Sequence, residues 1–368
     1  MAGVGSVLAM ALATALWWVV ASQRPWAALR SAEAAARSGD WPEALASWRA
    51  VNASPLASGR TLLAEARAAL ALGRAGEAET VLRLATIADP SDPQPWRLWL
   101  EILRVEDRPT DALRVGTRAL AEVAPDGRLG VLRALTLALL ADLPDDLARE
   151  TLKRWSAGDG ESPDPDALAA LYQRMNAMPR GGDPDRAARV AALSNLLARE
   201  PGRIPAREAL VTALADAGEI DRGRAALDAW PAGDRDARYW RLKGRWELEY
   251  DRRPDEASAA FVKTLEELPH DWKTRVRLAR ALRSLGREAE ARREAEAVGR
   301  LRERLDPESL GPALSAALEN PEPKALTDLA DLCEGVGLPR LAEAWRREAQ
   351  APREDRFESL LGESRRGG

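Results

Sequence analysis

The chain of 368 residues contains one cysteine, Cys333, and one histidine, His270. An internal disulfide is therefore impossible, and a zinc site made of Cys and His ligands from one chain is excluded. Cysteine usage does not report the compartment, since a chain without disulfides folds on either side of a membrane. Cys333 lies in LADLCEGVG without a basic neighbour, which predicts a small buried apolar residue and not a reactive thiol.

The sequence also lacks the motifs of common enzymes. GRAGEAE and GREAEAR carry glycine but no Lys-Ser/Thr ending, so neither is a phosphate-binding loop. His270 has Asp271 beside it in sequence and not behind its ring, which favours a surface or capping histidine. Asp164 and Asp166 are typical of a solvated loop or a helix N-cap, because calcium requires more ligands at stricter spacing. We therefore expect no catalytic residue, no cofactor, no metal and no enzymatic activity.

The composition is that of a globular chain, with 46% apolar and 30% charged residues. A net charge of −4 argues against a nucleic-acid partner. Only five of the 54 basic residues are lysine, an arginine bias typical of GC-rich bacterial genomes. The length permits two or three domains.

Residues 4–22, VGSVLAMALATALWWVVAS, contain no charged side chain. An α-helix of this length spans roughly 28 Å, close to the hydrocarbon thickness of a bilayer. Trp17 and Trp18 suit the interfacial aromatic belt. These features predict a membrane anchor. Two alternatives stay open: a cleaved signal peptide, because VVA resembles a cleavage site, and a buried helix.

A repeat runs through most of the remaining chain. Gly39, Gly73 and Asp107 stand 34 residues apart, and a small residue follows each of them five residues later. The same phase recurs at Gly218, Gly286 and Gly337 and, in a version one residue longer, at Asp251. The small residues of these units are Ala44, Ala78, Ala112, Gly223, Ala257, Ala291 and Ala342. A fixed period of this length indicates a repeat architecture.

The spacing is that of a helical hairpin. One helix ends near the Gly or Asp, where a left-handed or capping conformation costs little. A second helix begins at the acidic or proline residues that follow, as in DWPEA, RPTDA and RRPDEA. The small residue lies where the two helices cross, because a larger side chain would force them apart. Proline closes several units, at Pro90, Pro125 and Pro269.

The segment WRLKGRWELEYDRRPDEASAAFVKTLEELP carries Trp240, Gly244, Ala257, Phe261 and Pro269. This order of Trp, Gly, small residue, aromatic residue and proline resembles the tetratricopeptide repeat family, although lysine replaces the usual leucine before the glycine. The resemblance implies an all-α solenoid, a right-handed superhelix of stacked hairpins. We expect eight or nine hairpins behind the N-terminal membrane helix.

The quality of the repeats divides the chain into five parts. An anchor or signal segment (1–24) precedes repeats (25–125), degenerate hairpins with long loops (126–203), further repeats (204–350) and a flexible tail (351–368).

Two kinds of position bear on how the units pack. Gly116 and Arg346 occupy places where a bulky apolar residue is expected, which leaves the packing of those units open. Tryptophan mostly falls at packing positions, so we expect core residues and not a ligand cage. These tryptophans are Trp26, Trp41, Trp48, Trp96, Trp99, Trp240, Trp272 and Trp345.

In this family the first helix of each hairpin lines a concave groove that usually takes a peptide. Its outward positions here are rich in arginine, and guanidinium groups on one helix face can hold carboxylates or phosphates bidentately. Asn, which the family's carboxylate clamps also use, is missing from these faces. The alternative is an ordinary solvated surface. The candidate groove residues are Arg60, Arg67, Arg97, Arg104, Arg238, Arg241, Arg245, Arg280 and Arg283.

The resemblance implies a membrane-tethered scaffold that binds protein or peptide segments in a bacterial envelope role, and the arginines favour an acidic partner. The alternative is a structural subunit of a homo- or hetero-oligomer. Membrane-anchored bacterial repeat proteins usually export their body, which favours the inner membrane with an extracytoplasmic body. Arg24, Arg30 and Arg37 follow the span and instead favour a cytoplasmic body, and export after signal cleavage stays open.

Overall fold

The computed structural model describes residues 24–141, 143–157, 164–176, 186–319 and 321–351. Within these ranges the regular structure is helical, and no strand occurs. Over the same part of the chain no helix has the length and apolarity needed to cross a bilayer. The predicted anchor at residues 4–22 and most of the predicted tail lie outside the described residues.

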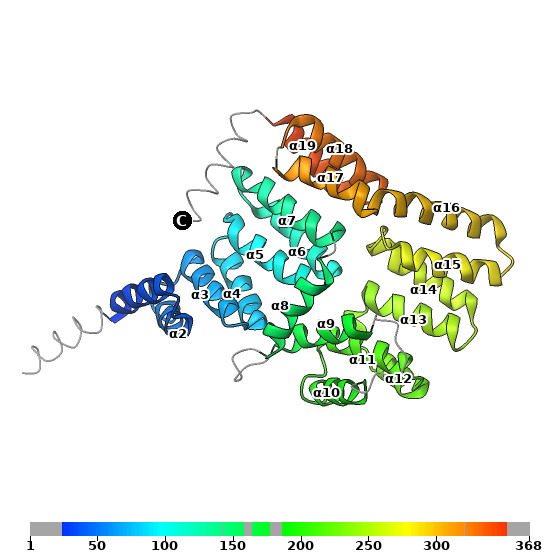
Figure 1. The fold of residues 1–368 in the computed structure, drawn as a ribbon, viewed down its shortest axis with the longest axis horizontal. Helices are drawn as coiled ribbons and strands as arrows, with labels where there is room; N and C mark the ends of the chain where they lie inside the picture. The colour runs from blue at the N-terminus through cyan, green and yellow to red at the C-terminus, as the bar shows by residue number, and fades with distance from the viewer. Residues whose placement is uncertain (1–23, 142, 158–163, 177–185, 320, 352–368) are drawn as a thin grey trace, which may run out of the picture.

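The helices follow one another in pairs for most of the chain (Figure 1). A helix over residues 24–38 comes first. The N-terminal part continues with α2 (Trp41–Asn52), α3 (Gly59–Ala71), α4 (Ala75–Ala88), α5 (Pro93–Val105), α6 (Pro109–Glu122) and α7 (Arg128–Leu140). The middle contains α8 (Asp145–Ala157), α9 (Pro165–Asn176), α10 (Arg186–Arg199), α11 (Ile204–Asp216) and α12 (Ile220–Asp228). The C-terminal part contains α13 (Ala237–Glu249), α14 (Pro254–Glu267), α15 (Trp272–Ser284), α16 (Glu288–Leu305), α17 (Pro307–Glu319), α18 (Pro323–Gly335) and α19 (Pro339–Gln350).

Left-handed residues stand at the predicted turns between paired helices. The five turn glycines have φ between 72° and 87°, a region in which a Cβ is strained. Asp107 reaches the same region with φ 54°. In the longer unit the left-handed residue is Arg252, also at 54°, and not Asp251, because the extra residue moves the bend by one position. The glycines are Gly39, Gly73, Gly218, Gly286 and Gly337.

The small residues of the repeat are buried, which fits the predicted close packing of the helices. Ala44, Ala78 and Ala112 have no exposed surface, and the corresponding residues of the later units are buried too. The first helix of a hairpin can supply a small residue too. Gly244 lies on α13, and a Cβ added to it would lie 2.5 Å from the ring of Phe261 on α14. Gly116, whose packing the sequence left open, is covered by Leu135, which would lie 2.5 Å from an added Cβ.

Half of the eight predicted core tryptophans are buried. Trp48, Trp96, Trp99 and Trp345 are buried, whereas Trp41, Trp240 and Trp272 are half-buried. The expectation is wrong for Trp26, which is 53% exposed.

Arg346 does not enter the core at all. It forms ion pairs with Asp331 and Glu334 on the surface, because Trp345, one residue earlier, faces inward.

The middle of the chain departs from the regular pairing. α8 packs on α9, α9 packs on α11, and α10 packs on α11. The path of the chain turns here, and the C-terminal half then runs back towards the N-terminal half through α13 to α16 (Figure 1).

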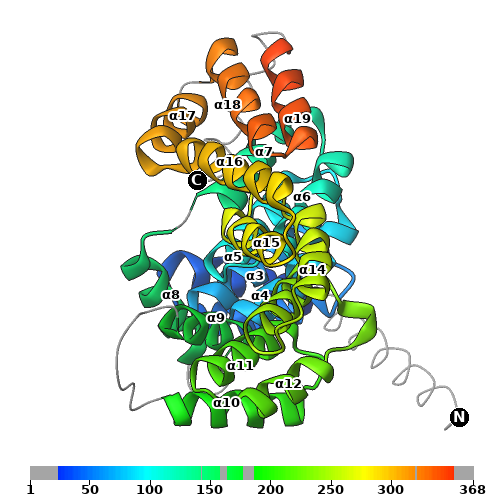
Figure 2. The same ribbon diagram turned by 90° about the vertical axis from the view of Figure 1, so that its right-hand side faces the viewer.

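The C-terminal hairpin closes the structure against the N-terminal half. In both views α19 lies beside α7 (Figures 1 and 2), and the two helices are in contact. Trp345 Nε1 donates a hydrogen bond of 3.0 Å to Thr136 Oγ1, and both side chains are fully buried. Leu314, Leu326 and Leu329 belong to the same core as the leucines of α5 and α7. The array of hairpins is therefore closed on itself through the contact of α7 with α19.

Replacing Gly244 with alanine tests the close crossing of α13 and α14. The added Cβ meets the fully buried ring of Phe261, so we expect a loss of about 1–3 kcal/mol in the free energy of unfolding, measured with urea. Gly299→Ala is the matched control, since nothing lies within 4 Å of that position in α16. Helix propensity alone should make the control more stable by up to about 1 kcal/mol. Equal effects of the two substitutions would contradict the close crossing.

Thr136→Val tests the closure between α7 and α19. Loss of the hydroxyl leaves the buried Nε1 of Trp345 without its acceptor, which should lower the free energy of unfolding by about 1–3 kcal/mol. Thr117→Val is the control, because Thr117 Oγ1 makes the same bond to a carbonyl four residues earlier on an exposed face. A variant as stable as this control would show that the bond does not contribute to closure.

Candidate functional site

The nine predicted groove arginines fall into four environments. Three line a cavity between α3, α5 and α7, which we call the N-terminal cavity: Arg67, Arg97 and Arg104. Two, Arg241 and Arg245, line a cavity between α8, α9, α11, α13 and α15, which we call the central cavity. Arg238 is buried in an ion cluster. The other three are exposed and line neither cavity: Arg60, Arg280 and Arg283.

The N-terminal cavity is strongly cationic. It has a volume of about 570 Å³, and its charged lining consists of four arginines and Glu101. Arg133 of α7 completes the set that the sequence predicted, and Leu98 and Leu137 add apolar surface beside it. The repeat phase could have identified Arg133, because α7 is the first helix of the next unit. The first helices of three successive hairpins, α3, α5 and α7, thus each contribute arginine to the N-terminal cavity.

Burial of the opposite face of α5 fixes the direction of its arginines. Asp92 caps the helix by accepting a hydrogen bond from the backbone N–H of Gln94, and Trp96 and Trp99 are buried below. The indole of Trp96 donates to the Pro90 carbonyl at 3.0 Å, which anchors the start of the helix. Arg97 and Arg104, seven residues apart, then share the face towards the cavity.

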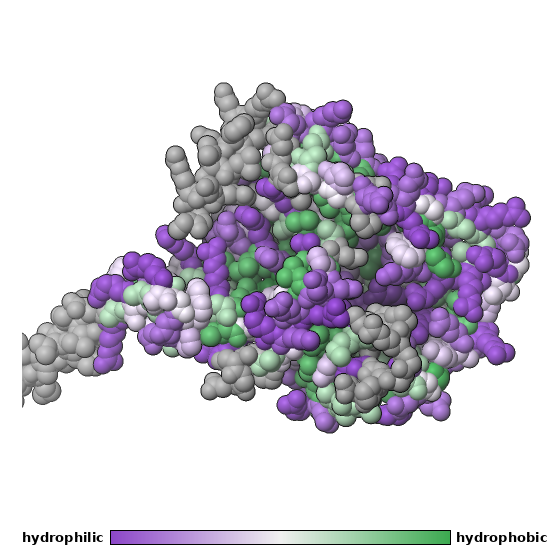
Figure 3. Space-filling model, in the orientation of Figure 1, coloured by the Kyte–Doolittle hydropathy of each residue, from purple (hydrophilic) through white to green (hydrophobic). Residues whose placement is uncertain are grey.

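The central cavity carries both signs of charge. It has a volume of about 810 Å³, and it is visible as a hydrophilic hollow near the middle of the molecule in Figure 3. Arg241 pairs with Glu208 at 2.5 Å, and Arg245 pairs with Asp216 at 3.2 Å. The two arginines that the sequence singled out here therefore bind carboxylates of the neighbouring helix α11, which reduces their capacity to hold an external anion.

Four further cations in the lining of the central cavity were not predicted: Arg149, Arg174, Lys273 and Arg277. Lys273 and Arg277 project from α15, at i and i+4, and none of the described carboxylates lies within 4 Å of either. Burial lowers the pKa of Arg277, and the positive charge of Arg245 adds to this effect, whereas the negative charge of Glu249 opposes it. The sequence could not distinguish these two cations of α15 from Arg280 and Arg283 on the same helix, because the side of α15 that faces the cavity depends on the closure.

A buried ion cluster joins α13 to α6. Arg238 Nη1 lies 3.0 Å from Asp111 Oδ2, and Asp236 holds the same guanidinium at 2.6 Å. Arg108 contacts Asp111 at 2.9 Å and Glu106 at 2.8 Å. The bond between Arg238 and Asp111 links the two halves of the chain, so Arg238 supports the closure; it lines a separate recess with Arg108 and Arg203 and neither of the two cavities above.

The carboxylates of the cluster differ in their proton affinity. Burial raises the pKa of Glu106 well above its usual value, although Arg108 opposes this effect. Burial raises the pKa of Asp111 as well, but Arg238 and Arg108 outweigh it, so that the pKa of Asp111 is lowered. The cluster therefore combines a carboxyl group whose pKa is raised with one whose pKa is lowered.

Asp164 and Asp166 belong to the same region. Asp164 caps α9 by accepting hydrogen bonds from the backbone N–H groups of Asp166 and Ala167. The predicted N-cap is therefore confirmed, but the residues are not solvated, since Asp164 is 3% and Asp166 is 7% exposed. Asp166 instead pairs with Arg203 of the loop before α11 at 2.9 Å.

The remaining candidates for chemistry are structural. Cys333 is fully buried, as predicted, and burial raises the pKa of its thiol to about 12. His270 is half-buried, and burial lowers its pKa. Among the described residues, no group of three or more His, Cys, Asp or Glu side chains is placed to hold a metal ion.

These features define an all-helical repeat protein with arginine-rich inner surfaces. A family model described as tetratricopeptide repeat matches residues 180–245, a range that includes α10, α11, α12 and most of α13. The resemblance to tetratricopeptide repeat proteins is thus confirmed. No curated protein matches the chain.

Three solved structures are similar to the chain at low sequence identity. A tetratricopeptide repeat protein from Parabacteroides merdae ATCC 43184 is 14% identical, with a TM-score of 0.32, and the match covers 71% of this chain and 99% of that one. The APC/C hetero-tetramer Cut9-Hcn1 is 13% identical, with a TM-score of 0.29, over 90% of this chain and 80% of that one. A monomeric IFIT1 mutant with Gppp-AAAA is 13% identical, with a TM-score of 0.23, over 87% and 79%.

Glu106→Gln tests the protonation of the ion cluster. Because the pKa of Glu106 is raised on folding, this group adds stability at low pH and loses it as the pH rises through the folded-state pKa. Glutamine keeps the shape but cannot ionise, so the free energy of unfolding of the variant should improve relative to the native chain from about pH 5 to about pH 8. The lowered pKa of His270 acts in the opposite direction, but both chains share it. If the free energies of unfolding of the variant and the native chain differed by the same amount at every pH in this range, the raised pKa of Glu106 would be contradicted.

Proposed function

We propose that the protein is a scaffold that binds acidic segments of partner proteins along its inner helices, with the N-terminal cavity as the principal site. Tetratricopeptide repeat proteins generally bind protein partners. The observation that carries the proposal is the charge of this cavity, where four arginines face one glutamate in about 570 Å³.

An extended segment fits this arrangement. Arg67 lies on α3, Arg97 and Arg104 lie on α5, and Arg133 lies on α7, so a chain that crosses the three helices meets a guanidinium on each. Guanidinium groups hold carboxylates bidentately, and Leu98 offers an apolar contact between them. Affinity would arise from several shallow contacts and would depend on salt.

The central cavity supplies a second, weaker attraction for anions. Lys273 and Arg277 face it without a close carboxylate among the described residues, whereas the charges of Arg241 and Arg245 are balanced by α11 and α13. A partner that extends past the N-terminal cavity would meet these two cations on α15. We therefore assign them a supporting role.

We further propose that residues 4–22 tether the scaffold to the bacterial inner membrane, with an extracytoplasmic body in an envelope assembly role. The uncharged sequence of this segment supports the tether, and the helix over 24–38 follows it directly, so the repeats would lie close to the bilayer. Protease accessibility in spheroplasts tests which side of the membrane the body occupies, because an extracytoplasmic body is cleaved without lysis.

A permanent structural subunit is the second candidate. Leu84 and Ile87 are 51% and 62% exposed and stand three residues apart on one face of α4, where a stable assembly would bury them. Light scattering separates the two functions, since a scaffold for transient partners is monomeric and a structural subunit forms a stable oligomer.

Reversal of two cavity arginines tests the proposed site. Arg67→Glu combined with Arg97→Glu should weaken binding of a fluorescein-labelled peptide of alternating Glu and Leu about tenfold or more, measured by fluorescence anisotropy. Arg280→Glu with Arg283→Glu is the matched control, because it makes the same charge change on exposed residues outside the cavity.

Binding to the native chain should also weaken as NaCl rises from about 0.05 M to about 0.3 M, because the attraction is screened. Equal losses in the cavity variant and the control would show that the acidic peptide responds to overall charge alone, and the N-terminal cavity would then be rejected as its site.

A further inference from the structure

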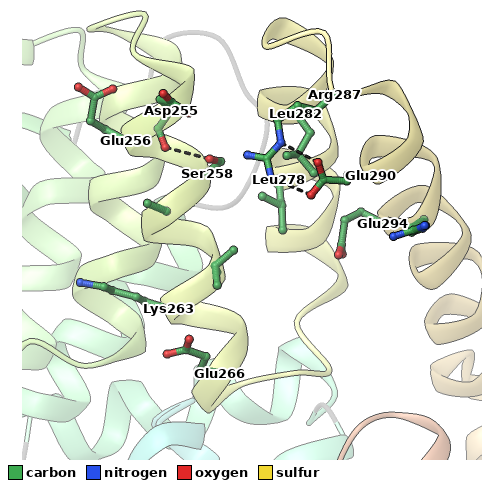
Figure 4. A pocket seen from close by; sticks show the side chains of 13 residues that line it. Asp255, Glu256, Ser258, Lys263, Glu266, Leu278, Leu282, Arg287, Glu290 and Glu294 are labelled. Atoms are coloured by element: carbon green, nitrogen blue, oxygen red, sulfur yellow. Dashed lines mark hydrogen bonds and ion pairs between the residues drawn. The ribbon is translucent and has the colours of Figure 1, made fainter.

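A second groove lies on the outer side of the C-terminal repeats, between α14 and α16 (Figure 4). Its volume is about 840 Å³, and Leu278 and Leu282 of α15 form its floor. The same helix α15 turns Lys273 and Arg277 towards the central cavity. One helix therefore separates two recesses, and the outer one takes no part in the function proposed above.

The groove is open because α16 is sparsely packed. Of its 18 residues only Ala291 and Leu301 are buried, and its contacts in this region are with α15. The preceding unit places Phe261 four residues after its small residue, whereas α16 has Ala295 in the corresponding position, and Ala295 is exposed. Short side chains on α16 thus leave the space beside α14 unfilled.

The wall formed by α14 has an apolar centre and acidic ends. Asp255, Ala259, Val262 and Glu266 follow one another at spacings of four, three and four, so they share one helix face. All four are exposed, and Val262, at 46%, is a large apolar side chain without cover. Together with the leucine floor, this stripe is the kind of surface on which an amphipathic helix packs.

The charges around the groove favour a basic occupant. Five carboxylates and three cations line it. Two of the cations are already engaged: Lys263 lies 3.8 Å from the ring centroid of Trp240, and Arg287 is held by Glu290 at 2.7 Å. By contrast, none of the described cations lies within 4 Å of Asp255, Glu256 or Glu266. These three carboxylates all lie on α14, so this wall of the groove carries an excess of negative charge.

We propose that this outer groove binds a basic amphipathic helix of a partner protein. The apolar face of that helix packs on Val262, Leu278 and Leu282, and its Lys or Arg residues meet the carboxylates of α14. The inner cavities attract acidic segments and the outer groove attracts a basic helix, so the scaffold holds two partners of opposite charge on opposite sides of α15.

A binding experiment with two variants tests the groove. Val262→Lys combined with Glu266→Lys places two cations on the exposed wall without touching the core. A fluorescein-labelled amphipathic helical peptide of Leu and Lys should bind this variant about tenfold or more weakly than the native chain, measured by anisotropy. Ile87→Lys with Glu122→Lys is the control, since it makes the same charge change at exposed sites on α4 and α6.

Each outcome decides the proposal. A loss confined to the Val262 and Glu266 variant, with an unchanged circular dichroism spectrum, supports it. Equal losses in the control, or no loss, overturn it, and so does a dimer of the native chain that the variant abolishes, because a second copy would then fill the groove. The acidic peptide should bind this variant as it binds the native chain, so failure here is separable from failure of the N-terminal cavity.

Discussion

The close crossing of two helices at a small residue is the contact on which the rest of the structure depends. Ala44, Ala78 and Ala112 are fully buried there, and Gly244 admits the ring of Phe261. Because the backbones approach so closely, each hairpin becomes a rigid unit that exposes two faces for its neighbours. The direction of every surface arginine follows from this crossing, since the buried stripe of a helix determines which residues remain outside.

Closure between the two halves converts these units into one body with separate recesses. Trp345 binds Thr136, and Arg238 binds Asp111, so helices far apart in the sequence hold one another in place. The ion cluster is costly to bury, and its carboxyl groups respond with pKa values shifted in opposite directions. Closure also determines that α15 has an inner, cationic side and an outer, acidic groove.

The arginines have different uses because their neighbours differ. Arg241 and Arg245 pair with carboxylates of α11 and α13 in a cavity of mixed charge, whereas the lining of the N-terminal cavity as a whole carries four arginines and one glutamate. A guanidinium that is balanced by a carboxylate fixes helices together, and an excess of guanidinium groups around a cavity attracts an anion. This difference is the reason for placing the acidic partner on α3, α5 and α7.

The sequence by itself determined the hairpins, the buried small residues and the burial of Cys333, because these depend on helix geometry within about one repeat. It also identified Arg67, Arg97 and Arg104, but it could not separate them from Arg238, whose partner lies 127 residues away. Only the tertiary structure decided that pairing, the bond between Trp345 and Thr136 across 209 residues, and the exposure of Val262. The physical reason is that small rotations between successive hairpins add up along the chain, and their sum decides which distant helices meet.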